Sequence, residues 1–186
     1  KGNFVGFLSD FVAYGSAETA LGVLKADINL KTPNDTLKYS GSLASKGFQL
    51  GKLLGAEPTV KKTAFDLEID GKGSDVESMW LDAKGQVTSI DVLGYKYKNV
   101  RVDGLLHRQV FEGNVLINDT NVKLDFNGLV NFKSDVPQIK CVSKVSGLHL
   151  DKINLVPSDT NGELSANFTL DMSGKTMSEF HGNLFV

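Results

Sequence analysis

Hydrophobic and polar residues alternate along most of this chain, and the alternation is cleanest between residues 122 and 132. There, every second position is apolar or glycine, with Lys123, Asp125 and Asn127 among the residues between them. Successive side chains of a β-strand point to opposite faces of a sheet. The segment is therefore predicted to be a strand with one apolar and one polar face. Its apolar side chains are Val122, Leu124, Phe126, Val130 and Phe132.

Similar alternation on both sides predicts a series of strands in one antiparallel meander. Glycines recur at intervals of 9, 10 and 9 residues from Gly85 to Gly113, a spacing typical of short strands joined by turns. Residues that favour turns are Pro33, Asn34, Asp35, Gly94, Gly104, Asn118 and Asp119. The predicted strands are 24–31, 37–43, 65–70, 86–92, 97–104, 110–117 and 163–172, and residues 3–15 are interpreted as a strand followed by a tight loop.

Three short segments interrupt this alternation with apolar residues at helical spacing. The first, residues 48–54, places Leu50, Leu53 and Leu54 on one side of a single helical turn that a glycine follows. A helix this short is unstable in water on its own, so it must pack against something larger. We predict short helical plugs over the end of a sheet, at 48–54, 75–81 and 148–153. The side chains expected to be buried there are Leu53, Leu54, Ile153 and Leu155.

The C-terminal third resembles an earlier part of the chain. The segment GFQLGKLLG at 47–55 is echoed by GLHLDKINL at 147–155, an offset of 100 residues. Internal repeats of amphipathic strands favour a structure that grows by addition, without closing around one core. We therefore interpret residues 1–186 as one fragment of a longer repetitive domain, with a weak repeat over about 37–87 and 138–186.

Composition limits the classes of function. Hydrophobic residues make up 41% of the chain and charged residues 23%, which suits a folded protein. The net charge of -2 gives no attraction to nucleic acid or to an anionic membrane surface. The single cysteine, Cys141, excludes an internal disulfide and is interpreted as a small buried side chain.

Catalytic and metal-binding motifs are not found in the sequence. The three histidines, His107, His149 and His181, are far apart, and His107 is expected to be exposed in a turn. The segment DGKGSD at 70–75 lacks the spaced ligands of a calcium-binding loop. Acidic residues fall on the polar positions of the predicted strands. We expect a protein that is not an enzyme and that uses no metal or cofactor.

Several segments together resemble the periplasmic region of AsmA-like, TamB-like envelope proteins, in the form found in Bacteroidetes. The resemblance rests on glycine-punctuated strands and on the FQLGKLLG plug. It is carried by residues 2–30, 39–55, 94–106 and 111–132 and covers essentially the whole chain. It implies a long protein anchored in the inner membrane by an N-terminal helix. It also implies a periplasmic β-sheet curled lengthwise into an open apolar groove, often called a β-taco.

The resemblance further implies what the groove does. It would shield the acyl chains of phospholipids on their way between inner and outer membrane, with phospholipid as the partner and an outer-membrane assembly protein as a second one. The strand pattern then predicts the groove lining. Its expected residues are Phe65, Leu67, Ile69, Phe111, Val115, Ile117, Val122, Leu124, Phe126, Val130 and Phe132.

Two alternatives remain open from the sequence. Within the same family, the segment could be a scaffold for outer-membrane protein translocation and assembly. Outside it, the strands could form a surface β-sandwich that binds carbohydrate. A sandwich would bury both apolar faces against each other and leave Tyr95, Tyr97 or Trp80 exposed as a sugar-stacking platform.

Overall fold

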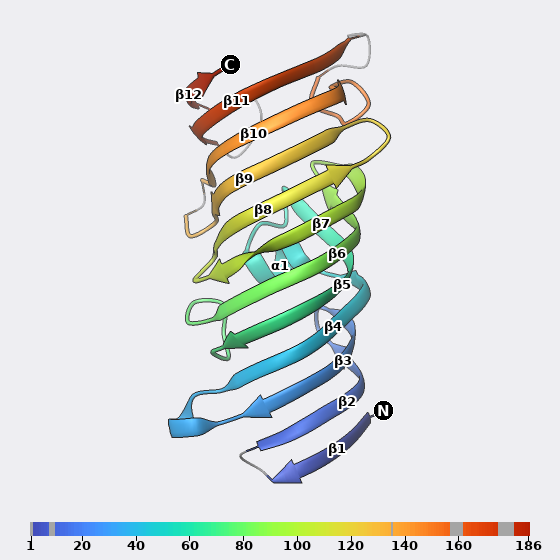
Figure 1. Ribbon diagram of the computed structural model, residues 1–186, viewed down its shortest axis with the longest axis vertical. Helices are drawn as coiled ribbons and strands as arrows, with labels where there is room; N and C mark the ends of the chain where they lie inside the picture. The colour runs from blue at the N-terminus through green and yellow to red at the C-terminus, as the bar shows by residue number, and fades with distance from the viewer. Residues whose placement is uncertain (1, 8–9, 135, 157–161, 175–180) are drawn as a thin grey trace.

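The chain forms one open antiparallel β-sheet in which the order of strands in space is their order in the sequence (Figure 1). The computed structural model describes residues 2–7, 10–134, 136–156, 162–174 and 181–186. The strands are β1 (Gly2–Phe7), β2 (Asp10–Thr19), β3 (Gly22–Lys31), β4 (Lys38–Phe48), β5 (Val60–Lys72), β6 (Trp80–Val92), β7 (Tyr95–His107), β8 (Val110–Asn118), β9 (Lys123–Asn131), β10 (Gln138–His149), β11 (Glu163–Ser173) and β12 (His181–Phe185).

The predicted all-β fold and meander are confirmed, and the sandwich alternative is wrong for the part of the chain described. All twelve strands belong to a single sheet, and β1 and β12 lie at its two opposite ends. Within the described ranges, the apolar faces of these strands therefore have no second sheet to pack against. The predicted tight loop after the first strand lies partly outside the described residues.

One predicted turn is wrong. Gly104 lies inside β7, and the chain reverses instead at Arg108 and Gln109, whose φ angles are 47° and 63°. Positive φ at both central residues is the geometry of a two-residue hairpin, which usually selects glycine or asparagine. The strand extends past Gly104 because Leu106 continues the apolar alternation and pairs with Phe111. The turn predicted at Gly94 is confirmed.

Only one of the three predicted plugs is an α-helix in the described chain. It is α1 (Leu50–Leu54), and it ends at Gly55, whose φ of 67° is the left-handed conformation common at helix ends. A single 3-10 turn, η1 (Pro33–Asp35), joins β3 to β4. Residues 149–155 form successive turns without a helix, where the N–H of Ile153 donates to the carbonyl of His149.

The plug predicted at 75–81 is also wrong, because a side chain competes with the backbone there. The Asp75 carboxylate accepts hydrogen bonds from the N–H groups of Glu77 and Ser78, at 3.1 and 2.9 Å, and from the Ser78 hydroxyl at 2.6 Å. A short acidic side chain can accept hydrogen bonds from nearby backbone N–H groups, and these bonds compete with helix formation. Trp80 then begins β6.

In the part of the chain that the structure describes, two clusters of buried apolar side chains lie along one long edge of the sheet. The connections β4–β5 and β10–β11 leave the sheet at this edge, because neighbouring strands are antiparallel. We call it the plug edge, and the opposite one the loop edge. Beneath α1 lie Phe48, Phe65, Val87 and Val100. Beneath the turns at 150–155 lie Val122, Val145, Leu148 and Ile153.

The two plugged connections share a local irregularity. The register of β4 against β5 shifts between Ser45 and Phe48, and that of β10 against β11 shifts between Val145 and Leu148. These positions are 100 residues apart, as are the segments that look alike in sequence. An extra residue in one strand of a pair bends that strand. The bulge occurs in each case just before the chain leaves the sheet to form a plug.

Substituting Gly41 with alanine is expected to lower the free energy of unfolding by about 1–3 kcal/mol, the usual cost of holding a side chain in a glycine-only conformation. Gly41 has a φ of 138°, and a Cβ there would collide with the backbone carbonyl oxygen of Asp27 on β3. Gly47, also in β4, has open space where a Cβ would lie, with no neighbouring atom within 4 Å. Urea unfolding of Gly41→Ala and Gly47→Ala would test this, and equal stability of the two variants would contradict it.

Candidate functional site

The strand registers join the apolar sides of neighbouring strands into one continuous surface. Leu67 pairs with Gly85, Gly85 with Val102, Val102 with Val115 and Val115 with Phe126. Because paired residues of adjacent strands point to the same side of a sheet, these five positions form a line that crosses five strands. We call this surface, which continues on both sides of the line, the apolar face.

The apolar face lies on the same side of the sheet as α1, which Figure 1 shows behind the strands. Leu50 and Leu53 of α1 pack on the cluster that contains Phe65 and Val100. The face is thus covered by protein near the plug edge. Leu67 and Val115 pack against the same cluster and are half-buried, and Phe126, on the next strand, is also half-buried.

Large side chains on the apolar face lie against glycines of the neighbouring strands. A Cβ at Gly104 would come within 2.9 Å of the ring of Phe111, and one at Gly71 would meet the ring of Tyr39. The rings therefore occupy the places that side chains of those glycines would take. Aromatic cover of strand glycines is a known way to stabilise a curved sheet.

The predicted lining residues fall into two groups. Phe65 and Val122 are buried in the two clusters at the plug edge, and Ile69 is also buried. The other eight are half-buried, and they are Leu67, Phe111, Val115, Ile117, Leu124, Phe126, Val130 and Phe132. Register brings six of these together in the pairs Phe111–Val130, Val115–Phe126 and Ile117–Leu124.

The apolar face has further members that were not predicted from the sequence. Leu43, Val102 and Leu81 belong to it through their pairing with Leu67, Gly85 and Gly71. Apolar and polar residues alternate in the sequence around these three positions, and this alternation could have identified them as members of an apolar strand face. Alternation defines two faces for each strand but cannot match the faces of separate strands.

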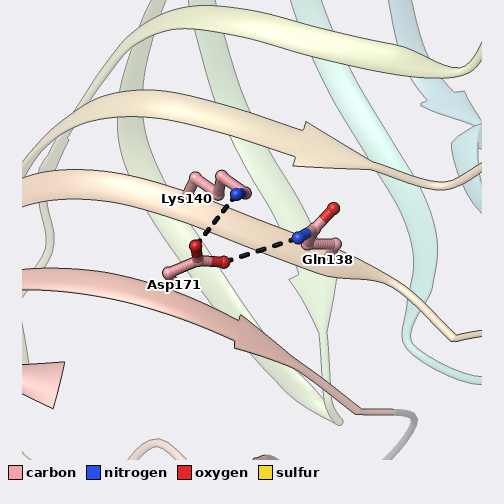
Figure 2. Close-up of polar contacts among 3 residues, drawn as sticks. All are labelled: Gln138, Lys140 and Asp171. Carbon is pink, nitrogen blue, oxygen red and sulfur yellow. Dashed lines mark hydrogen bonds and ion pairs between the residues drawn. The ribbon is translucent and has the colours of Figure 1, made fainter. Parts of the chain in front are cut away.

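The opposite face of the sheet is mainly polar and carries cross-strand ion pairs. Figure 2 shows Asp171 of β11 between Lys140 and Gln138 of β10, with 2.9 Å from Lys140 Nζ to Asp171 Oδ2. The hydrogen bond from Lys140 lowers the pKa of Asp171 below its ordinary value. Exposed pairs of this kind contribute little to stability. They indicate which side of the sheet faces water.

A buried polar cluster closes the plug edge between the two hydrophobic clusters. Asp119 accepts hydrogen bonds from the Tyr95 hydroxyl at 2.5 Å and from the backbone N–H groups of Lys98 and Asn121, each at 3.0 Å. Burial acts to raise the pKa of Asp119, but these hydrogen bonds outweigh it and hold the pKa below its ordinary value. This cluster pins the β8–β9 turn to β7.

Tyr95 and Tyr97 do not form an exposed stacking platform. Their rings contact edge to face, with centroids 4.8 Å apart, and both residues are half-buried. Burial raises the pKa of Tyr97 to about 12, and the negative charges of Tyr95 and Asp119 act in the same direction. Of the three aromatic residues that the carbohydrate-binding alternative named, only Trp80 is exposed, at 40%.

His107 is not exposed in a turn, as the sequence had suggested, because it ends β7 and is half-buried. Its ring stacks on Trp80 with centroids 4.9 Å apart. His149 ends β10, and its carbonyl accepts hydrogen bonds from Lys152 and Ile153. His181 lies in β12 beside the Ser173 hydroxyl. Among the residues that the structure describes, no cluster of His, Cys, Asp and Glu could hold a metal ion.

In the described ranges no helix is long and apolar enough to span a membrane. The chain matches no family model, no curated protein and no solved structure at a significant level.

Proposed function

We propose that this chain is a non-enzymatic segment of an AsmA-like, TamB-like envelope protein, and that its apolar face shields phospholipid acyl chains in the periplasm. The single observation that carries the proposal is the continuity of the apolar face across strands. Leu67, Val102 and Val115 share one register line and stay half-buried. Contiguous apolar surface that the protein leaves partly uncovered is typical of interaction sites, which supports the proposal.

The energetics suit an acyl chain as the ligand. Burying one methylene group contributes about 0.8 kcal/mol, so a chain of roughly 15 methylenes could gain on the order of 12 kcal/mol before ordering costs. Such binding needs no hydrogen-bonding partner and no particular residue, only a continuous dry surface. This accounts for a functional surface without a catalytic or ligand-binding motif.

The resemblance to the family supplies the remaining parts of the proposal. The complete protein would be anchored in the inner membrane, and this segment would stand in the periplasm of a Gram-negative envelope. Its partners would be phospholipid acyl chains and an outer-membrane assembly protein. Under the alternative function, a scaffold for outer-membrane protein assembly, the apolar face would contact protein segments instead of lipid.

A photo-crosslinking amino acid at position 126 is expected to capture lipid, and one at position 125 is expected to capture little. Phe126 lies on the apolar face and Asp125 on the opposite face of the same strand. Only one of two adjacent strand positions can face a bound acyl chain. The benzophenone analogue of phenylalanine would be placed at each position, the protein irradiated with phospholipid vesicles, and adducts identified by mass spectrometry.

The same experiment separates the alternatives. Equal lipid labelling at both positions would indicate non-specific partition and contradict the proposal. When repeated in cells, protein adducts at position 126 without lipid adducts would favour the scaffold function. A second pair of positions, Val115 and Leu116 on β8, offers an independent repeat, because Val115 pairs with Phe126 and Leu116 with Asp125.

A further inference from the structure

A hollow of about 530 Å³ lies over β3, β4 and β5, which occupy the lower half of Figure 1. Its lining is mainly polar, and it includes Val12, Asp27, Asn29, Ser40, Ser42 and Glu68. Ser42 and Glu68 are next in sequence to Leu43 and Leu67 of the apolar face, so their side chains point to the opposite side of the sheet. We call that side the polar face and this depression the polar hollow.

The polar hollow exists because β4 carries the short sequence Ser-Gly-Ser between strands with longer side chains. Register places Ser42 between Asp27 of β3 and Glu68 of β5. In the next row, Ser40 lies beside Asn29 of β3. Paired side chains of neighbouring strands stand next to each other on one face. Short side chains in the middle strand therefore leave a space that the longer side chains border.

Several polar groups of the hollow lack partners in the described chain. Lys84 is paired in register with both Glu68 and Asp103, but its ammonium binds Asp103 at 2.8 Å. Neither Asp27 nor Glu68 forms an ion pair with a described residue. The Oδ1 atom of Asn29 is buried and accepts no hydrogen bond from the residues that the structure describes. Buried acceptors are normally satisfied, so the hollow favours a ligand that donates hydrogen bonds.

An exposed aromatic ring stands beside the polar hollow. Tyr14 of β2 pairs with Asp27, so it lies on the same face, and it is 64% exposed. Val12, which pairs with Asn29, is 43% exposed. Binding sites for small molecules combine apolar contact surface with a few polar groups that fix the orientation of the ligand. Tyr14 and Val12 supply the apolar surface, and the hollow supplies the polar groups.

The chemistry of the hollow excludes several classes of ligand. Its two carboxylates repel anions, which disfavours phosphate esters and acidic peptides. Asp27 and Glu68 are two strand spacings apart, roughly 9–10 Å, which is too far for both to hold one metal ion. Consistent with this, the described part of the chain contains no group of acidic, His and Cys residues that could bind a metal. An apolar ligand would leave the oxygen acceptors unsatisfied.

We infer that the polar hollow binds an uncharged saccharide. Its hydroxyl groups donate hydrogen bonds to Asp27, Asn29 and Glu68, and the apolar C–H face of one sugar ring packs on Tyr14. Both requirements are met by a pyranose ring, which has hydroxyls around its rim and C–H groups on its faces. The inference goes beyond the proposed function, because acyl chains would lie on the other face of the sheet.

Isothermal titration calorimetry of the purified chain would test the inference with three uncharged probes, maltotriose, cellotriose and triacetylchitotriose. At least one of them is expected to bind with a dissociation constant on the order of 1 mM or tighter. Tyr14→Ala is expected to weaken that binding about tenfold, because the ring contact is lost. Tyr14→Phe keeps the ring and should bind like the unsubstituted chain. Circular dichroism would show that both variants are folded.

A second substitution tests the hydrogen bonds. Glu68→Gln is expected to weaken saccharide binding about fivefold, because an ionised acceptor forms stronger hydrogen bonds than a neutral one. The matched control is Glu112→Gln in β8, which removes another exposed carboxylate from the polar face. Glu112 is next in sequence to Gly113, which pairs with Gly104 on the apolar face. This control should leave saccharide binding unchanged.

The outcomes distinguish this inference from other ligands and from the proposed function. Absence of binding for all three saccharides would overturn it. So would saccharide binding that survives Tyr14→Ala and Glu68→Gln together. Trilysine that bound more tightly than any saccharide, and lost affinity on Glu68→Gln, would assign the hollow to a cationic peptide instead. Tyr14→Ala should leave phospholipid binding unchanged, so the saccharide site and the acyl-chain surface can each fail alone.

Discussion

Replacing Ile153 with alanine is expected to lower the free energy of unfolding by about 2–5 kcal/mol, the usual range for deleting a large buried side chain. Ile153 is 2% exposed and packs with Val122, Val145 and Leu148 beneath the turns at 150–155. Two effects lower the stability. Alanine buries fewer methyl and methylene groups than isoleucine, and the space that they occupied remains as a cavity. A rigid sheet below the residue limits how far that cavity can collapse. Urea unfolding followed by circular dichroism would measure the change.

The control is Val142→Ala in β10, because Val142 is 64% exposed on the polar face of the sheet. It should change the stability by less than about 0.5 kcal/mol. Leu54→Ala, in the plug that lies about 100 residues earlier, should behave like Ile153→Ala, since Leu54 is also buried. An unfolding midpoint unchanged by Ile153→Ala would mean that the turns at 150–155 do not hold the sheet edge.

Replacing Phe126 with aspartate is expected to reduce phospholipid binding by more than about tenfold, because a carboxylate loses its hydration when an acyl chain covers it. Phe126 lies mid-strand on the apolar face, between Val115 and Ser143 of the adjacent strands. Its ring is half-buried, so part of it is available to a ligand. Binding would be measured by flotation with phospholipid vesicles or by native mass spectrometry of lipid adducts.

Val142→Asp is the matched control, since it places the same charge on the opposite face, opposite Asn127 and Thr169. Lipid binding should be unaffected by it. Circular dichroism and the unfolding midpoint of both variants must first show that each is folded. A folded Phe126→Asp variant that binds lipid as well as the unsubstituted chain would contradict acyl-chain binding on the apolar face.

Most strands could be predicted from the local alternation of apolar and polar residues. Alternation over 24–31 and 65–70 predicted β3 and β5, and the structure confirms both with somewhat longer bounds. The Leu50–Leu54 helix was predictable because a strand cannot place Leu50, Leu53 and Leu54 on one side. Where a single polar side chain competed with the backbone, as Asp75 does, the helical spacing at 75–81 misled the prediction.

Which residues belong to the apolar face could be assigned only from the tertiary structure. Leu43 and Val102 alternate as clearly as Phe126 does, yet only the registers of β4, β6 and β7 place them on the same face as Leu67. A shift of one residue in any of these registers would turn a whole strand over. His107 shows the same limit, since its stacking on Trp80 depends on the pairing of β6 with β7.

Amphipathic strands and a short helical plug could be predicted from the order of residues alone, because the period of hydrophobic residues is a local property of each segment. Which strand faces join into one surface, and which of its residues the plugs bury, depends on the pairing of strands in the folded sheet. The same pairing brings Lys38, Lys72 and Trp80 together at one edge, although Lys38 and Lys72 are 34 positions apart in the sequence. Pairing between distant strands depends on the register of the whole sheet, and no local pattern contains that information.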